Sequence, residues 1–167
     1  HAVQVNHLHH HAHCMDDDDV EAMSAKMPGW KAFCLGPYFP ISLHIRAFQL
    51  AKPWQKRWIW AEIISMTALV ILAFFVLDWM WLRYHIIAMA VGQSFTGFFA
   101  VWTVHHDCDE SHHIARTQRG WLKNFISYNM FYHIEHHLFP SIPTCHLPEL
   151  ARRLDVAAPE LKEKGVY

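Results

Sequence analysis

The sequence predicts an all-α membrane protein, in which a transmembrane helical hairpin carries histidine-bearing helical arms on the cytoplasmic side. Three observations lead to this prediction. Two long apolar runs lie in the middle of the chain, the spacing H-x-x-H-H occurs on both sides of them, and Lys and Arg gather on the same two flanks. With 167 residues, the chain is one domain or part of one.

The first arm, residues 1–25, is polar and rich in histidine. His7, His10 and His11 stand at i, i+3 and i+4, so a helix would place them on one face. The run Asp16-Asp17-Asp18-Asp19, followed by Glu21, is interpreted as a solvated loop. The alternative is that these carboxylates orient the histidines.

Residues 26–57 lead from the first arm to the apolar runs. Proline and glycine break them into short pieces, and aromatic side chains lie among Lys and Arg. This mixture is typical of a segment that lies along a membrane surface.

Two transmembrane helices are expected at about residues 58–77 and 84–104. A span of the bilayer core needs about 20 apolar residues, and Glu62 is the only charged residue of the first run. The second run is interrupted by His85 and Gln93. Between them, residues 78–83 form a short turn with Trp79 and Trp81, as an interfacial belt would.

The hairpin returns the chain to its starting side, so both arms end on the same face of the membrane. Six of the 14 Lys and Arg residues precede the hairpin, seven follow it, and Arg83 alone lies in its turn. The positive-inside bias therefore places both arms in the cytoplasm.

The second arm contains the stretch Tyr132–Pro143. A helix here would present His133, His136 and His137 on one face and end before Pro140. Between the hairpin and this stretch lie four more candidates: His105, His106, His112 and His113. Residues 1–150 are expected to form one domain, with 151–167 as a C-terminal surface tail.

Six histidines in two groups exceed the usual set for one catalytic zinc, which keeps three protein ligands and an open position. The zinc-protease pattern H-E-x-x-H is absent. Imidazole suits iron as well as zinc or copper, and two groups suit a pair of ions. Beside a membrane, such a centre is placed to attack an unactivated C–H bond of a lipid, which calls for an oxidant built from O₂ at iron.

Other classes of protein fit less well. The near-neutral net charge gives no reason to expect nucleic acid, and the four cysteines show no pattern of a disulfide framework. A metal transporter or sensor is the alternative from another class. Its site would normally lie within the spans, where the polar residues are Glu62, His85 and Gln93.

The stretch Tyr132–Pro143 resembles the third histidine box of the membrane-bound fatty acid desaturases, a family that includes carotenoid ketolases and lipid hydroxylases. The stretch His7–His11 is similar to the second box of that family. The resemblance covers most of residues 1–150. It implies an O₂-dependent oxidoreductase with two irons, which introduces a double bond into a fatty acyl chain; hydroxylation or ketolation is the alternative.

By this resemblance the iron ligands are His7, His10, His11, His113, His133, His136 and His137, and no catalytic residue is expected beyond them. His105, His106 and His112 are rivals of His113, and Asn129 either helps to hold the site or serves packing or capping. The partners implied are the bilayer, a lipid or acyl substrate, and a separate ferredoxin or cytochrome b5 that supplies electrons. The first histidine box of the family is missing. A chain truncated at its N-terminus is expected, and the alternative is that the site is incomplete.

Overall fold

The computed structural model describes residues 1–108 and 114–165, with the side chains of 163–165 left aside, and the regular elements of this part of the chain are helices. The chain divides into two compact units, residues 1–99 and 100–167, and each is described by itself. Unit 1 contains α1 (Ala2–Ala12), η1 (Ala22–Lys26), α2 (Gly29–Cys34), η2 (Gly36–Tyr38), α3 (Phe39–Leu50), α4 (Pro53–Ile71), η3 (Leu72–Val76) and α5 (Met80–Ser94).

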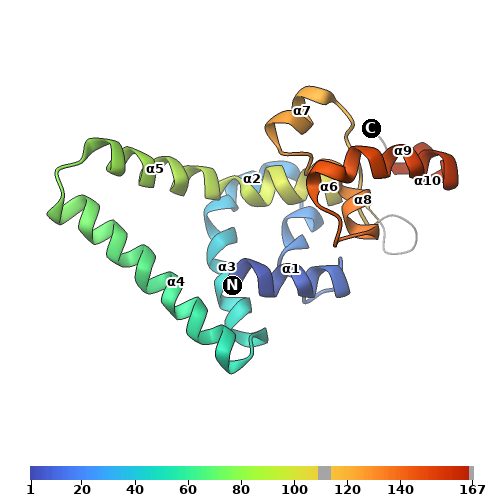
Figure 1. The fold of residues 1–167 in the computed structure, drawn as a ribbon. Helices are drawn as coiled ribbons and strands as arrows, with labels where there is room; N and C mark the ends of the chain where they lie inside the picture. Colours follow the sequence, from blue (N-terminus) through green and yellow to red (C-terminus); the bar gives the residue numbers. More distant parts are fainter. Residues whose placement is uncertain (109–113, 166–167) are drawn as a thin grey trace. The chain divides into compact units, whose positions relative to one another are not determined.

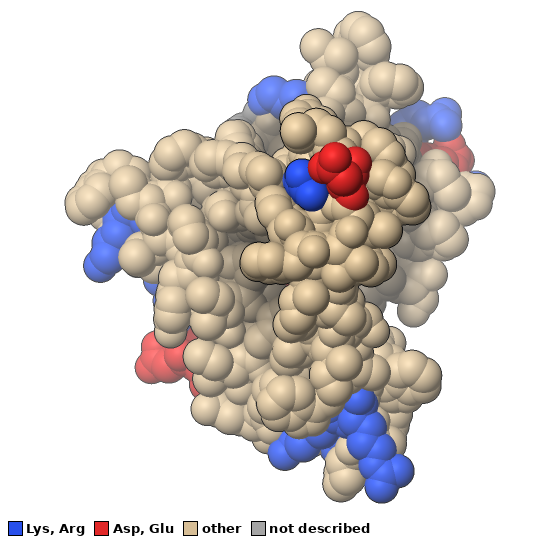
Figure 2. Space-filling model, turned by 90° about the vertical axis from the view of Figure 1, so that its left-hand side faces the viewer, with Lys and Arg blue, Asp and Glu red and all other residues tan. Residues whose placement is uncertain are grey.

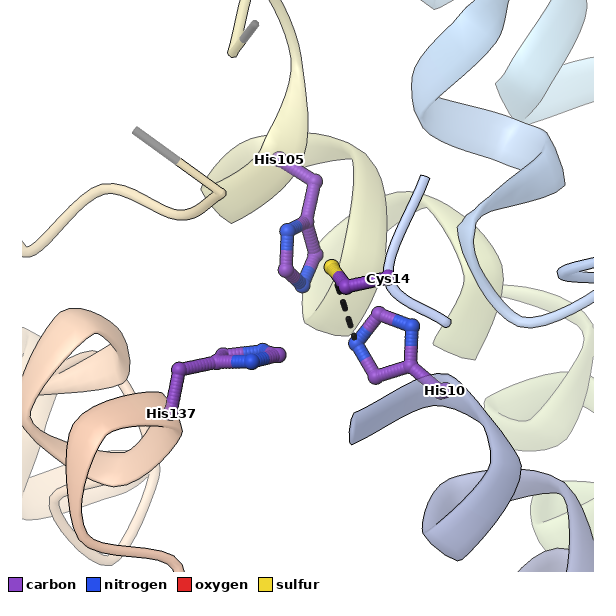
Figure 3. Close-up of side chains that lie close together, drawn as sticks. All are labelled: His10, Cys14, His105 and His137. Atoms are coloured by element: carbon purple, nitrogen blue, oxygen red, sulfur yellow. Dashed lines mark hydrogen bonds between the residues drawn. The ribbon is translucent and has the colours of Figure 1, made fainter. Parts of the chain in front are cut away.

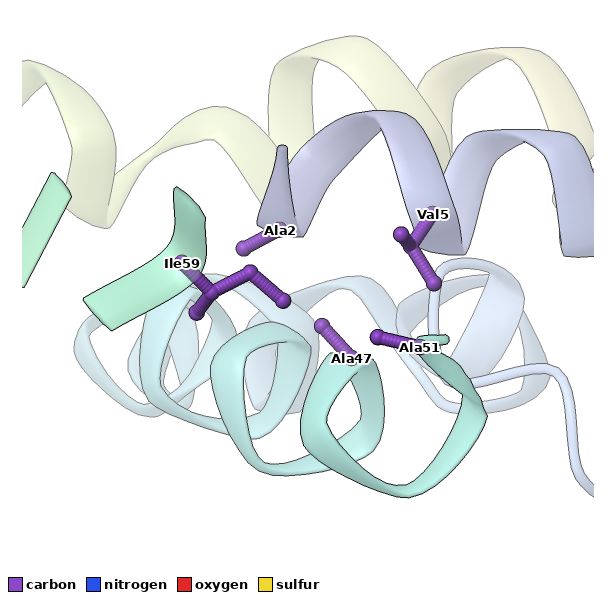
Figure 4. Packing of buried hydrophobic residues seen from close by; sticks show 5 residues of the cluster. All are labelled: Ala2, Val5, Ala47, Ala51 and Ile59. Carbon is purple, nitrogen blue, oxygen red and sulfur yellow. The ribbon is translucent and has the colours of Figure 1, made fainter. Parts of the chain in front are cut away.

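The core of unit 1 lies where α1 packs against α3 and the start of α4 (Figure 4). Small side chains let the helices approach closely; the buried cluster consists of Ala2, Val5, Ala47, Ala51 and Ile59. Asn6, also buried, donates hydrogen bonds from Nδ2 to the carbonyl oxygens of Ala2 (2.8 Å) and Leu43 (2.7 Å). The apolar cluster and the hydrogen bonds of Asn6 together fix which face of α1 packs on α3 and which face points away from it.

The α4 and α5 helices meet at a turn and diverge from it, and α3 lies between their far ends (Figure 1). Arg83 holds the turn. Its guanidinium donates to the carbonyl oxygens of Ala73 (2.9 Å) and Leu77 (2.8 Å) and lies 3.2 Å from the Asp78 carboxylate. A cation at carbonyls that end a helix is favourable, because these groups carry partial negative charge.

Two helices are long and apolar enough to cross a membrane: Pro53–Val76, with 24 residues, and Met80–His105, with 26 residues. Both exceed the hydrocarbon thickness of about 30 Å at about 1.5 Å per residue. Most of their side chains are exposed, unlike those of a soluble core helix. On the face of the molecule seen from the side of the α4–α5 turn, charged residues are few (Figure 2).

These helices cover the two predicted spans except for Leu77, and they begin five and four residues before them. The reason is local. Pro53 occupies the first turn of α4, where its missing N–H and fixed φ are favourable, so Trp54 to Arg57 join the helix although they are not uniformly apolar.

The segment that leads to the spans packs closely on the end of α5. A Cβ on Gly36 would lie 1.8 Å from the carbonyl oxygen of Ser94, so only glycine permits this contact. A Cβ on Gly97 would likewise lie 2.9 Å from Cγ of the Phe39 ring. The Ser24 hydroxyl donates to the Gly97 carbonyl oxygen (2.7 Å), at the point where the π-helical turn η4 (Gly97–Trp102) begins.

Unit 2 opens with the last turns of the second long apolar helix and continues through short elements: α6 (Thr103–His105), α7 (Trp121–Ile126), α8 (His133–Leu138), η5 (Thr144–His146), α9 (Leu147–Ala157) and α10 (Pro159–Gly165). Its buried apolar side chains are Val101, Val104, Ala115, Leu147 and Ala151. Leu147 and Ala151 lie on α9, which packs against α8. The helix of the second histidine group is therefore supported by the helix that follows it.

Candidate metal centre

The first histidine cluster, His7, His10 and His11, lies on α1 as the spacing predicts. His10 is only 1 % exposed, and His7 and His11 are half-buried. The Nε2 atoms of His7 and His11 are 3.2 Å apart. Two imidazole nitrogens bound to one ion at about 2.0–2.1 Å are separated by about 3.0–3.5 Å, so this pair matches shared ligation.

The acidic run folds back onto this cluster. The Asp19 carboxylate lies 2.7 Å from Nδ1 of His10, and it accepts hydrogen bonds from the backbone N–H groups of Met15 (3.0 Å) and Ala22 (3.2 Å). The Glu21 carboxylate lies 2.8 Å from Nδ1 of His7. A carboxylate at Nδ1 places the proton there and leaves the Nε2 lone pair for a metal.

The electrostatics of the two pairs follow from these contacts. The hydrogen bond to Glu21 raises the pKa of His7 against the opposing effect of burial. Burial works to raise the pKa of Asp19, but the hydrogen bond and charge of His10, with the two backbone N–H groups, hold it below its usual value. Asp19 is therefore ionised at neutral pH and keeps its partner imidazole oriented.

Cys14 lies one turn beyond His10. Its Sγ is 3.9 Å from His10 Nε2 (Figure 3, dashed line). A thiolate would add a soft donor to this cluster, and the sequence pattern gave it no role.

The second histidine cluster, His105, His133, His136 and His137, lies in unit 2. His105 comes from α6 and the other three from α8, and Figure 3 shows His105 and His137 on these two helices. The Nε2 atoms of His105 and His133 are 2.9 Å apart, again close to the separation expected for shared ligation. The His105 and His137 rings are 4.9 Å apart at their centroids.

His105 is oriented by the backbone rather than by a carboxylate. Its Nδ1 lies 2.5 Å from the carbonyl oxygen of Ile114. A carbonyl can only accept, so Nδ1 carries the proton and Nε2 presents its lone pair toward His133.

The carboxylate within the H-I-E-H-H sequence of α8 points away from the imidazoles. Glu135 is 2 % exposed. One of its oxygens accepts from the Thr117 hydroxyl (2.5 Å) and the other from the Arg119 guanidinium (3.0 Å). Arg119 also donates to both oxygens of Asp155 on α9, at 2.8 and 2.7 Å. This network attaches α8 to its surroundings.

The sequence-predicted ligands therefore stand in two groups. His7, His10 and His11 share one face of α1, and His133, His136 and His137 share α8. His113 lies outside the described residues, as does His112. Of the remaining rivals, His105 lies against His133, whereas His106 stacks on Trp102, with ring centroids 4.2 Å apart, and pairs with Asp107. Asn129 lies in the turn before α8, where its backbone adopts a left-handed conformation with a φ of 63°.

Sequence reasoning left several supporting residues without a role. Asp19 and Glu21 belong to an acidic run, and the sequence does not distinguish them from the exposed carboxylates beside them. Thr117, Arg119 and Glu135 lie far apart from Asp155 in sequence, so no spacing rule connects them. His105 was among the candidates because it stands at the end of the second apolar run, and the structure buries it together with Val101 and Val104.

The long apolar helices and the two histidine clusters define a metal-binding protein of the membrane-bound, all-helical class. Comparison with known proteins identifies the family. The model of the fatty acid desaturase family matches residues 1–164, and the chain belongs to that family. The family resemblance predicted from the histidine boxes is thus confirmed.

Individual relatives agree. The chain is 26 % identical to a beta-carotene ketolase of Paracoccus sp. over 159 residues, which is 92 % of this chain and 59 % of the ketolase. It is 57 % identical over 37 residues to a sphingolipid delta(4)-desaturase/C4-monooxygenase of Bos taurus, covering 22 % of this chain and 10 % of the relative. The chain thus spans under two thirds of the length of each. No solved structure gave a significant match.

Proposed function

We propose that the chain carries the iron site of an O₂-dependent oxidoreductase that introduces a double bond into a fatty acyl chain. One observation carries the proposal. In a chain of the desaturase family, each histidine cluster contains two Nε2 atoms at a separation suited to one ion, 3.2 Å in the first and 2.9 Å in the second. In each pair, one imidazole has its Nδ1 tied to an acceptor.

The donor set fits iron. His7, His10, His11, His133, His136 and His137 would hold two irons, with His105 or His113 as a further ligand. All-imidazole ligation is compatible with iron. The hairpin would bring both clusters to one side of the membrane, which the distribution of Lys and Arg indicates to be the cytoplasmic side.

The chemistry divides between metal and protein. When bound, the irons supply the activation of O₂ that removal of hydrogen from an unactivated C–H bond requires. The side chains of this protein would hold the irons, and neighbouring groups orient the imidazoles. Asp19, Glu21 and the Ile114 carbonyl keep the protons of three imidazoles on Nδ1. We expect the substrate to enter from the bilayer and the electrons to come from a separate ferredoxin or cytochrome b5.

A second candidate is ketolation of a carotenoid. It is favoured by the beta-carotene ketolase match, which extends over 92 % of this chain, whereas the sphingolipid desaturase match covers 22 %. Both reactions begin with oxidation of a C–H bond of an apolar substrate and call for the same kind of oxidant.

Product analysis separates the candidates. The chain is produced in cells supplied with saturated acyl lipids or with β-carotene, and extracted lipids are analysed by gas chromatography and mass spectrometry. A new double bond supports the desaturase, and a carotenoid that gains a carbonyl oxygen supports the ketolase. Metal analysis of the purified protein should find about two iron ions per chain. One zinc or copper per chain, with neither product, would contradict both candidates.

A further inference from the structure

The α7 helix of unit 2 buries its polar face and exposes its apolar face. Its buried residue is polar: Asn124 is 3 % exposed. Its large apolar residues point outward, with Trp121 79 %, Phe125 77 % and Ile126 69 % exposed. A surface helix of a soluble protein shows the opposite arrangement, with the apolar stripe facing the core.

Hydrogen bonds fix this orientation. The Asn124 side chain donates from Nδ2 to the carbonyl oxygens of Gln118 (2.7 Å) and Gly120 (3.1 Å). The Lys123 ammonium donates to the Gln118 side-chain oxygen (2.6 Å). Rotating α7 to bury its apolar face would break these hydrogen bonds, and a buried polar group left unpaired is destabilising.

The outward apolar surface extends past the end of α7. Tyr128 is 81 % exposed, and its φ is 53°, a left-handed conformation uncommon for a residue other than glycine. The next residue, Asn129, shares that conformation, and its N–H donates to the Asn124 carbonyl oxygen (2.8 Å). We call the exposed set the α7 patch; it comprises Trp121, Leu122, Phe125, Ile126 and Tyr128.

We propose that the α7 patch inserts into the interface of the lipid bilayer and anchors unit 2 there, in addition to the two spans. Its composition suits that location. Trp and Tyr, which favour the headgroup level, bracket Leu122, Phe125 and Ile126, which suit the acyl boundary. Unit 2 also contains the end of the second candidate span, His105, only 16 residues before Trp121.

A protein partner is the less suitable occupant. A stable protein–protein interface uses about 20–30 residues on each side, and the α7 patch has five. A bilayer needs no such area, because a short apolar face gains free energy with every side chain that leaves water. The anchor would lie directly before α8, so it would hold the helix of three predicted iron ligands at the membrane surface.

Fluorescence quenching tests the anchor in the whole protein. The chain is reconstituted into phosphatidylcholine vesicles whose lipids carry bromine near the headgroup end of the acyl chain. The emission of Trp121 is taken as the difference between the wild type and Trp121→Phe. We expect bromolipid to remove most of this emission and aqueous acrylamide to remove little.

Two variants make the result decisive. Val156→Trp, built on Trp121→Phe, reports a site on α9 that is 85 % exposed, and it should respond mainly to acrylamide. Phe125→Asp keeps Trp121 but adds a charge one turn away, so the bromolipid effect on Trp121 should largely disappear. Quenching of Trp121 by acrylamide alone would place the patch in water. Quenching by neither reagent would mean that protein covers it. Each of these results overturns the anchor.

Discussion

The helices α1 and α8 carry the same H-x-x-H-H spacing but are supported in different ways. On α1, carboxylates bond directly to the imidazoles: Asp19 to His10 and Glu21 to His7. On α8, the carboxylate that stands between the histidines in sequence, Glu135, turns away from them and pairs with Arg119 and Thr117. Identical ligand spacing therefore does not imply identical surroundings.

We infer from this difference that the carboxylates beside α1 and the carboxylate on α8 have different roles. A carboxylate on Nδ1 tunes the metal affinity of the imidazole. A carboxylate buried with Arg and Thr partners holds a helix in position, and its loss is felt first in the free energy of unfolding. The two clusters should thus respond differently to the same kind of substitution.

The largest effect is expected where the clusters are alike, at the ligands themselves. His10→Ala and His136→Ala should each reduce product formation to background, because both groups are proposed to hold iron. Membrane insertion, measured by resistance to alkaline extraction, should stay normal. His146→Ala, on an exposed histidine outside both clusters, is the control. Normal product yield from either variant would remove its cluster from the proposed site.

The next effect should appear on α1 alone. Asp19→Asn removes the charge at His10 Nδ1, so the affinity of the protein for Fe²⁺ or Co²⁺ should fall by roughly 10–100-fold. Competition with a chelator measures this affinity. Asp17→Asn is a matched control, because Asp17 belongs to the same acidic run but is fully exposed. Equal affinities of the two variants would contradict the role of Asp19.

Glu21 should act through pH. Because Glu21 raises the pKa of His7, protons compete with metal there at a higher pH than at an ordinary imidazole. Metal should therefore leave the first cluster as pH falls through the raised pKa. In Glu21→Gln the loss should move to lower pH, as a titration of bound Co²⁺ absorbance would show. An unchanged profile would mean that His7 does not bind the ion.

The sequence sufficed for the features that depend on local pattern. Apolar runs gave the two long helices, and spacing gave the histidine faces of α1 and α8, because both follow from the 3.6-residue repeat. It did not separate Asp19 from Asp17, since only the backbone turn from Met15 to Ala22 decides which carboxylate faces His10. The pairing of Arg119 with Asp155 was hidden for the same reason: it depends on how α9 packs.

On α8 the expected effect is on stability. Glu135→Gln removes the charge that pairs with Arg119 inside unit 2, and the free energy of unfolding should fall by about 1–3 kcal/mol. Thermal unfolding in detergent measures it. Glu149→Gln, on α9, removes only pairs with the exposed Arg152 and Arg153, so it should change the free energy of unfolding far less. If Glu135→Gln lost metal affinity at an unchanged Tm, the contrast between α1 and α8 would fail.

The smallest effect should come from the outer end of the same network. The hydrogen bond and charge of Arg119, with Lys162 nearby, hold the pKa of Asp155 below its usual value. A carboxyl whose pKa is lower in the folded state stabilises the fold above its unfolded pKa of about 3.9, and this contribution is lost as pH falls through the folded value.

Asp155→Asn should therefore lower the free energy of unfolding at neutral pH by at most about 1 kcal/mol, the range of a pair near the surface. The difference from the wild type should shrink below about pH 4 and vanish in stronger acid, where Asp155 is protonated in both states. In an Arg119→Gln background the same substitution should cause little change at any pH. A difference that persisted there would show that Asp155 supports α9 without Arg119, and α8 would then depend on Glu135 and Thr117 alone.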